Sequence, residues 1–308
     1  MMCLRQAAWH HHTPFSPEMI GGTTNFFLRH SGGCERLILC GMMESILPEF
    51  RQMWRKRMNL LFVNDDGISS SSLHLLARCA KARGHHVLVC APATQQSAKG
   101  QSLTINAPII THQVDLPCAD EAWAVEGTPA DCTKRGLKML SSRPVDLVIS
   151  GINEGHNAGM AIDVSGTVGA AREAVCHGVA ALAASAEVDT PDETLNVFAE
   201  WVITLAEKLH QSPLPPQTVC NVNVPARPLH ELLPPVMARV SRAMYHDSYE
   251  RRISPRGVTY FWSLPVEGYD PAEEDTDLYL LEKGHITVTM LQPDTAGQTA
   301  FEHILTDL

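Results

Sequence analysis

A run of four apolar residues that ends in two adjacent carboxylates constrains the fold of this chain more than any other feature. Residues 60–63 read Leu-Leu-Phe-Val, and Asn-Asp-Asp-Gly follows at once. An uninterrupted apolar run is typical of a strand buried on both faces of a parallel sheet. In such sheets ligands bind beyond the carboxyl ends of the strands, where Asp65 and Asp66 lie. Two neighbouring carboxylates repel each other, and a divalent cation is one remedy. A polar turn in which Asp66 or Ser69 caps the next helix is the alternative.

Composition limits the class of protein. The chain has 308 residues, of which 44% are hydrophobic, so it can bury a substantial core. Its formal net charge of -10 argues against binding to a nucleic-acid duplex, which requires a basic surface. The nine cysteines form no CxxC pair, which indicates buried thiols in a reducing compartment. No apolar run is long enough to span a membrane. A cytoplasmic protein without a membrane partner is therefore predicted.

Residues 1–57 differ from the rest of the chain. They contain three consecutive histidines at 10–12 and a basic cluster before Met58, without sustained hydrophobic periodicity. We predict that 1–57 is an extension that is disordered or dispensable, and that the natural start is Met58. Loss of folding or activity in a chain that begins at Met58 would contradict this prediction.

From residue 58 onward, strand patterns alternate with helix patterns, which predicts an α/β fold with a Rossmann-like core and a mainly parallel sheet. The strands expected in this core domain, residues 58–212, are 59–63, 86–90, 122–125, 145–150 and 178–183. Short strands at 103–105 and 109–110 are also expected, as a small antiparallel excursion. The expected helices are 69–83, 128–140, 168–175 and 193–210.

The character of the sequence changes after the proline-rich segment 212–216. Residues 213–308 are predicted to form a β-rich C-terminal extension, with strands at 219–224, 236–239 and 285–291 and a short helix that begins near Asp275. A hairpin is expected to turn at Pro-Arg-Gly within 253–262, and it carries the consecutive aromatic residues Tyr260, Phe261 and Trp262. Such an apolar hairpin is expected to act as an arm that packs against a partner subunit.

Three polar loops, 64–67, 94–102 and 151–159, each follow a predicted strand and can therefore meet at one crevice. They offer carboxylate, hydroxyl and amide oxygens, which suit Mg²⁺ or Mn²⁺ better than zinc. Ser165, Gly166 and Thr167 precede a helix, where backbone N–H groups can face a phosphate. The chain lacks both a P-loop motif and a GxGxxG after its first core strand. The pattern indicates metal-assisted phosphoryl chemistry.

Four motifs in this order and spacing resemble the survival protein E (SurE) family. They are Asn64-Asp65-Asp66-Gly67, Glu126-Gly127-Thr128-Pro129-Ala130-Asp131-Cys132, Ser150-Gly151-Ile152-Asn153 and Ser165-Gly166-Thr167-Val168. The resemblance covers Met58 to the C-terminus. It implies a metal-dependent 5′-nucleotidase that hydrolyses nucleoside monophosphates to nucleoside and phosphate, with possible action on 3′-nucleotides and short polyphosphate. It also implies a homodimer or homotetramer that exchanges C-terminal arms.

The resemblance further implies a set of site residues. One divalent cation per subunit, magnesium or manganese, would be held by Asp65, Asp66, Ser97 and Asn153. The substrate phosphate would lie at Ser165, Gly166 and Thr167 with Asn157 nearby. In metal-assisted hydrolysis, Asp65 would orient or deprotonate the attacking water, and either Asp65 or Asp66 could be the base.

Two residues depart from the family pattern. Ala98 replaces a usual glycine beside Ser97, and Val164 replaces a usual tyrosine before Ser165. The extra Cβ at Ala98 leaves open a nucleotide-binding or sensing module with weak catalysis. A metal-dependent glycosyl- or nucleotidyl-transferase is a third interpretation. Phosphate release from nucleoside monophosphates, with and without a chelator, distinguishes the first two.

Overall fold

The computed structural model describes residues 16–20, 23–30, 33–36, 57–264 and 268–292. The chain divides into two compact units, 1–56 and 57–308. The described part of the first unit is a three-stranded antiparallel sheet, where the sequence predicts no regular structure. Its strands are β1 (Ser16–Ile20), β2 (Thr23–His30) and β3 (Gly33–Arg36). The prediction that residues 1–57 are dispensable stays a prediction.

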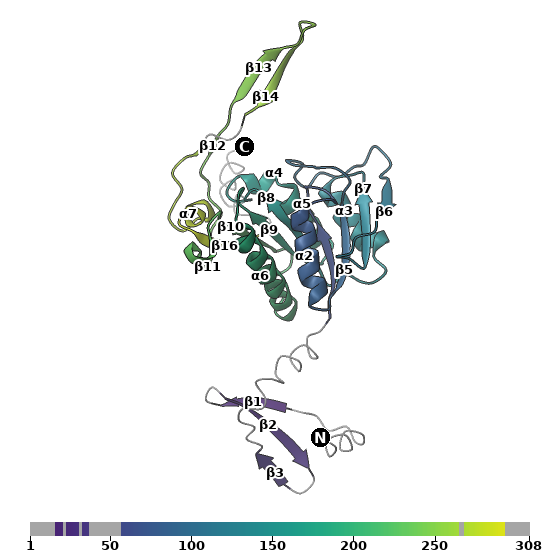
Figure 1. Cartoon of the computed structure of the whole chain (residues 1–308), viewed down its shortest axis with the longest axis vertical. Helices are drawn as coiled ribbons and strands as arrows, with labels where there is room; N and C mark the ends of the chain where they lie inside the picture. The colour runs from purple at the N-terminus through teal and green to yellow at the C-terminus, as the bar shows by residue number, and fades with distance from the viewer. Residues whose placement is uncertain (1–15, 21–22, 31–32, 37–56, 265–267, 293–308) are drawn as a thin grey trace, which may run out of the picture. The chain divides into compact units, whose positions relative to one another are not determined.

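The second unit is built on a nine-stranded sheet in the order β11-β16-β10-β9-β8-β4-β5-β7-β6 (Figure 1). The six parallel strands are β4 (Asn59–Val63), β5 (His86–Pro92), β7 (Glu121–Val125), β8 (Leu147–Glu154), β9 (Ala180–Ala186) and β10 (Val219–Val224). The three remaining strands run in the opposite direction: β6 (Thr111–Gln113), β16 (His285–Leu291) and β11 (Leu233–Met237). The predicted α/β fold with a mainly parallel sheet is confirmed.

Helices cover both faces of this sheet and make two cores. One face packs against α2 (Ser71–Ala82) and α6 (Asp192–Gln211), and the other against α3 (Pro129–Arg135) and α5 (Gly166–Cys176). The apolar run of β4 serves both cores, since Phe62 faces the first and Val63 the second. This double burial explains the uninterrupted apolar run. The smaller helices are the π-helix Gly136–Leu140, α4 (Ala161–Val164), the 3-10 helix Leu229–Glu231 and α7 (Asp277–Glu282).

The strand order places a topological switch point between β4 and β8. From β4 the chain proceeds through β5 and β7 on one side, and then returns to β8, β9 and β10 on the other. Crossovers that leave in opposite directions open a crevice beyond the carboxyl ends of the two central strands. The loops that follow β4 and β8 lie at this crevice.

The structure excludes one alternative from the sequence and corrects one local prediction. Ser70, not Asp66 or Ser69, caps α2, because its hydroxyl accepts from the Leu73 N–H at 3.4 Å. That frees the Asp66 carboxylate for the crevice. No strand forms at 103–105 or 109–110; the antiparallel excursion is β6, which pairs with β7. The cap predicted at Thr128 is confirmed, with Asp131 completing a capping box.

The predicted C-terminal extension is only partly separate from the core. Strands β10 and β16 continue the main sheet, since Val222 pairs with Val288. What projects from the sheet is a hairpin of β13 (Tyr249–Ile253) and β14 (Thr259–Ser263), carried on the short pair β12 (Tyr245–His246) and β15 (Gly268–Tyr269) (Figure 1). We call residues 241–272 the arm. Phe261 and Trp262 are 60% and 58% exposed, so the hairpin has an unburied apolar surface.

No helix within the described ranges has the length and apolar character to cross a membrane. Six cysteines of the described residues are free thiols, and five of these are buried.

Candidate active site

The turn after β4 is held in shape by Asn64 and Gly67. The Asn64 side chain donates to the Gly67 carbonyl at 3.1 Å and accepts from the Gly67 N–H at 3.2 Å. Gly67 has a φ of +102°, and a Cβ there would lie 3.3 Å from the Pro92 carbonyl oxygen. The turn therefore ends the strand and removes Asp65 and Asp66 from strand alternation.

Asp65 lies against the first turn of α5. Its side chain is nearly buried, at 4% exposure, and the Thr167 hydroxyl donates to its Oδ1 at 2.5 Å. Burial raises the pKa of Asp65 above its ordinary value, while hydrogen bonds from the Thr167 hydroxyl and from the backbone of Thr167 and Gly166 lower it in part. The structure thus brings Asp65, Gly166 and Thr167 together.

Asp66 is half-buried beside Asp65. Burial, and then the negative charge of Asp65, raise the pKa of Asp66 to about 6. A hydrogen bond from the backbone of Glu154 lowers it, whereas the Glu154 charge raises it further. Asp66 therefore contacts the last residue of β8 at a place where negative charge is in excess.

The loop after β5 joins the same crevice. The Gln96 N–H donates to the Asp65 carbonyl at 2.7 Å, and the Gly100 N–H donates to the Val164 carbonyl at 2.9 Å. The loop therefore spans from the carboxylate turn to the start of α5. Ser97 is exposed within it, and Ala98 has a φ of +58°. That left-handed conformation favours glycine, so Ala98, which replaces the usual glycine of the family, is in a strained backbone conformation.

Asn153 lies near the end of β8, which continues to Glu154, so the loop predicted at 151–159 begins only at Gly155. The Asn153 side-chain Nδ2 donates to the Gly155 carbonyl at 2.7 Å, so Oδ1 is the atom that can face a cation. Gly151 has a φ of +129°, and a Cβ there would lie 2.1 Å from the Ala184 carbonyl oxygen. The strand can therefore bend toward the crevice only with glycine at this position.

Ser165 caps α5, since its hydroxyl accepts from the Val168 N–H at 3.1 Å. Helix α5 has 11 residues, so its N-terminus carries a partial positive charge at the crevice. Gly166 allows the close approach of Asp65, because a Cβ on Gly166 would lie 2.8 Å from the Asp65 Cβ. Paired carboxylates, a helix N-terminus and a hydroxyl thus meet at one point.

Comparison with known proteins identifies the family. The family model described as "Survival protein SurE" matches residues 60–247, which is more than half of the chain. This chain belongs to the SurE family. The resemblance inferred from its four motifs is confirmed.

Members of the SurE family named "5'-nucleotidase SurE" are similar to this chain over most of their own length. The protein from Synechococcus sp. (strain JA-3-3Ab) is 38% identical over 250 residues, which cover 80% of this chain and 96% of the relative. The one from Thermosynechococcus vestitus is 40% identical over 248 residues, or 78% of this chain and 93% of the relative. A solved SurE protein from Aquifex aeolicus superimposes with a TM-score of 0.67 at 31% identity, covering 80% of this chain and 99% of that one.

Asn157, predicted from the SurE resemblance to lie near the phosphate, is held toward the sheet. Its Nδ2 donates to the Ser185 hydroxyl at 2.8 Å, and its backbone is bound by the side chains of Asn221 and Asn223. A direct substrate contact by Asn157 stays a prediction. Sequence reasoning missed Asn221 and Asn223, although two asparagines inside an apolar strand are an unusual pattern.

The residues at the crevice fit a divalent cation. Asp65 and Asp66 place two carboxylates together, and the pKa of about 6 for Asp66 reflects charge that a cation would offset. Within the described ranges, no group of three or more His, Cys, Asp or Glu side chains is placed to hold a metal. The hydroxyl of Ser97 and the amide of Asn153, predicted as the further ligands, offer oxygen atoms of the kind that a hard cation prefers, and their role stays a prediction.

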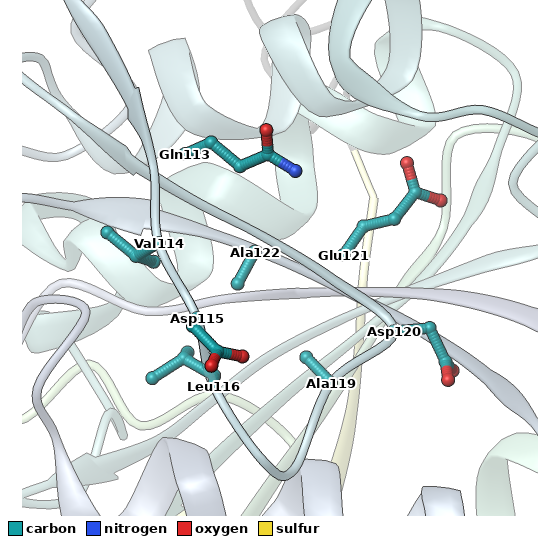
Figure 2. Close-up of a pocket in the computed structure, with 8 residues that line it drawn as sticks. All are labelled: Gln113, Val114, Asp115, Leu116, Ala119, Asp120, Glu121 and Ala122. Atoms are coloured by element: carbon teal, nitrogen blue, oxygen red, sulfur yellow. The ribbon is translucent and has the colours of Figure 1, made fainter.

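A hollow away from this site lies along the stretch from β6 to β7 and has a volume of about 370 Å³. Figure 2 shows its lining residues, with the carboxylates of Asp120 and Glu121 pointing in different directions. Asp120 accepts from the Val87 N–H at 2.9 Å, and Glu121 accepts from the Ser142 hydroxyl at 2.6 Å. Two of the three carboxylates that line the hollow are therefore used within the fold.

Proposed function

We propose that this SurE family protein hydrolyses nucleoside monophosphates to nucleoside and phosphate, using one divalent cation, Mg²⁺ or Mn²⁺, per subunit. The observation that carries the proposal is the contact between the paired carboxylates and the start of α5, where the Thr167 hydroxyl lies 2.5 Å from Asp65 Oδ1. Cation ligands and a phosphate-binding helix terminus then lie side by side. The names of the relatives support the same activity.

In the proposed mechanism Asp65, Asp66, Asn153 and Ser97 would hold the cation. When bound, a divalent cation polarises a phosphoryl oxygen and lowers the pKa of a water. The partial positive charge at the N-terminus of α5, at Ser165 to Thr167, would stabilise negative charge on the phosphoryl oxygens, while the backbone N–H groups of Gly166 and Thr167 donate to Asp65. Thr167 fixes the orientation of Asp65 through its hydroxyl. Either Asp65 or Asp66 would accept a proton from the attacking water.

The test is phosphate release from the full chain. Nucleoside 5′-monophosphates are supplied with Mn²⁺ or Mg²⁺, and a chelator is then added. We expect release that requires the cation and that falls at least a hundredfold in Asp65→Asn, since both a cation ligand and a candidate base are changed. Nucleotide binding without release in the wild-type protein would favour the sensing module instead. Full activity in Asp65→Asn would contradict the assigned roles. Nucleoside 3′-monophosphates and short polyphosphate complete the panel.

We also propose a homodimer or homotetramer formed through the arm, in the cytoplasm. The exposed hairpin supports the assembly, because Tyr249, Phe261 and Trp262 are each more than half exposed, at 65%, 60% and 58%. The free thiols support a reducing compartment. Mass measurement in solution tests the assembly, and a monomer at micromolar concentration would contradict it.

A further inference from the structure

The active-site loop 155–159 is fixed by side chains from the C-terminal part of the chain. It lies between Asn153, a proposed cation ligand, and Ser165, a proposed phosphate contact. Strand β10 holds its middle: Asn223 accepts from the Asn157 N–H at 2.7 Å and donates to the Asn157 carbonyl at 3.1 Å. Asn221 donates to the same carbonyl at 2.9 Å. These amides do what a neighbouring strand would otherwise do for the loop backbone.

Asp277, the first residue of α7, holds the end of this loop. Its Oδ2 accepts from the Gly159 N–H at 2.9 Å. Its Oδ1 accepts from the Ser241 N–H at 2.8 Å and from the Leu278 N–H at 2.9 Å. The Asp277 side chain is fully buried, and three N–H donors replace its hydration. One carboxylate therefore joins the active-site loop to Ser241, where the arm begins.

Apolar contacts follow the same path. Ala158 of the loop clusters with Leu278 and Leu281 of α7, against which Ala243 and Tyr269 of the arm also pack. A Cβ on Gly159 would lie 2.9 Å from Leu278 Cδ1, so the loop and α7 are in close contact. The His156 ring lies 6.2 Å from the Tyr269 ring, measured between centroids. Loop, helix and arm base form one packed unit, with the Asp277 carboxylate as its polar centre.

We propose that Asp277 is a positioning residue that sets the geometry of the active-site loop and ties it to the base of the arm. The inference rests on the proposed phosphatase function of the crevice and adds a residue that does not touch substrate. Displacement of the arm base is transmitted to Gly159 through the two oxygens of one side chain. The loop in turn carries Asn157 and adjoins Asn153, so its position affects both cation and substrate.

The variant that tests this proposal is Asp277→Asn in the full chain. The amide nitrogen that replaces one oxygen cannot accept from an N–H group, so the Gly159 or the Ser241 bond is lost. We expect kcat for a nucleoside monophosphate, assayed far below the melting temperature, to fall by roughly tenfold to hundredfold, as a misplacement near 1 Å does. Hydrogen exchange should rise in residues 155–160 and 241–244 together and remain unchanged in β4 and β5.

Asp275→Asn is the matched control. Asp275 makes an exposed ion pair with Arg239 at 2.6 Å, two residues from Asp277, and is not bonded to the loop. It should leave kcat and the exchange of residues 155–160 unchanged. The proposal is overturned if Asp277→Asn loses thermal stability but keeps the wild-type kcat and the wild-type hydrogen exchange of residues 155–160. The role of Asp277 would then be structural only.

Two further readouts keep the proposal testable in every case. If Asp277→Asn fails to fold, hydrogen exchange in the wild-type protein tests the proposal instead. The backbone amides of Gly159 and Ser241 should exchange far more slowly than amides of open loops, because both donate to Asp277. Fast exchange of either amide would refute the proposed link between the loop and the arm. Absence of phosphate release from the wild-type protein would refute the proposed function alone, since the exchange readouts need no turnover.

Discussion

Gly166→Ala is the sharpest test of the contact between the carboxylates and α5. A Cβ on Gly166 would lie 2.8 Å from the Asp65 Cβ, 2.9 Å from its Oδ2 and 3.1 Å from Pro129 Cγ. Carbon atoms attract best at about 3.5 Å, so Asp65 or the start of α5 must move by roughly 0.7 Å. The Thr167 hydroxyl, 2.5 Å from Asp65 Oδ1, cannot keep its bond through such a shift without moving as well.

The expected effect on activity is much larger than the effect on folding. Overpacking a buried position by one methyl group costs about 1–3 kcal/mol, which a domain of this size can tolerate. A catalytic group misplaced by close to 1 Å can lose about 10²-fold in rate. We therefore expect Gly166→Ala to fold, with kcat/KM reduced by about two orders of magnitude. The cation concentration for half-maximal activity should rise, because Asp65 is a proposed ligand.

The assay is steady-state phosphate release with a titration of Mn²⁺, alongside circular dichroism and thermal melting. Gly268→Ala is the matched control, since a Cβ on Gly268 meets nothing within 4 Å. That variant should keep wild-type kinetics and cation dependence. If Gly166→Ala folds normally and keeps both wild-type kcat/KM and wild-type cation dependence, the assignment of the site to this contact is refuted.

Three other substitutions probe the fold and the site. Asp66→Asn should raise the melting temperature of the chelator-treated protein at pH 8 but not at pH 4. The pKa of Asp66 in the folded protein is about 6, above the ordinary 3.8, so ionisation of Asp66 lowers the free energy of unfolding. This loss of stability grows as pH rises from 4 to 6 and is absent below pH 4. Equal melting temperatures of wild type and variant at pH 8 would contradict this expectation. Ala98→Gly should maintain or raise the melting temperature. The left-handed φ of +58° costs a non-glycine residue about 1–2 kcal/mol in the folded state. The greater entropy that glycine gives to the unfolded chain costs only about 0.4–1 kcal/mol of stability. A clear fall in thermal melts would show that Ala98 is not strained. Trp262→Glu should reduce the mass of the assembly measured by light scattering. Val188→Glu is the control and should not reduce it, because Val188 is 53% exposed but lies outside the arm. An unchanged mass for Trp262→Glu would show that the hairpin is not part of the interface.

The sequence was sufficient to locate the crevice because the signals there are local. The apolar run of β4 indicated burial on both faces, and parallel strands align their carboxyl ends, so loops distant in sequence were expected to meet. The structure brings Asp65 to Thr167 and the Gln96 backbone to Asp65, as that reasoning requires. The α2 cap was missed because Asp66, Ser69 and Ser70 are all good caps. Local sequence does not decide among them, since what excludes Asp66 is its place in the crevice.

The support for the loop could not be read from sequence for a different physical reason. Asn157 and Asn223 are 66 residues apart, and Gly159 and Asp277 are 118 apart. No spacing rule links such pairs, because their meeting depends on the order of strands in the finished sheet. A buried polar residue in an apolar strand is nevertheless a signal, since its burial is costly unless a partner satisfies it. Asn221 and Asn223 within Val219–Val224 could have been marked as residues in need of a partner. Their partner is the backbone of Asn157 in the loop beside the site, so strand β10 supports the active site.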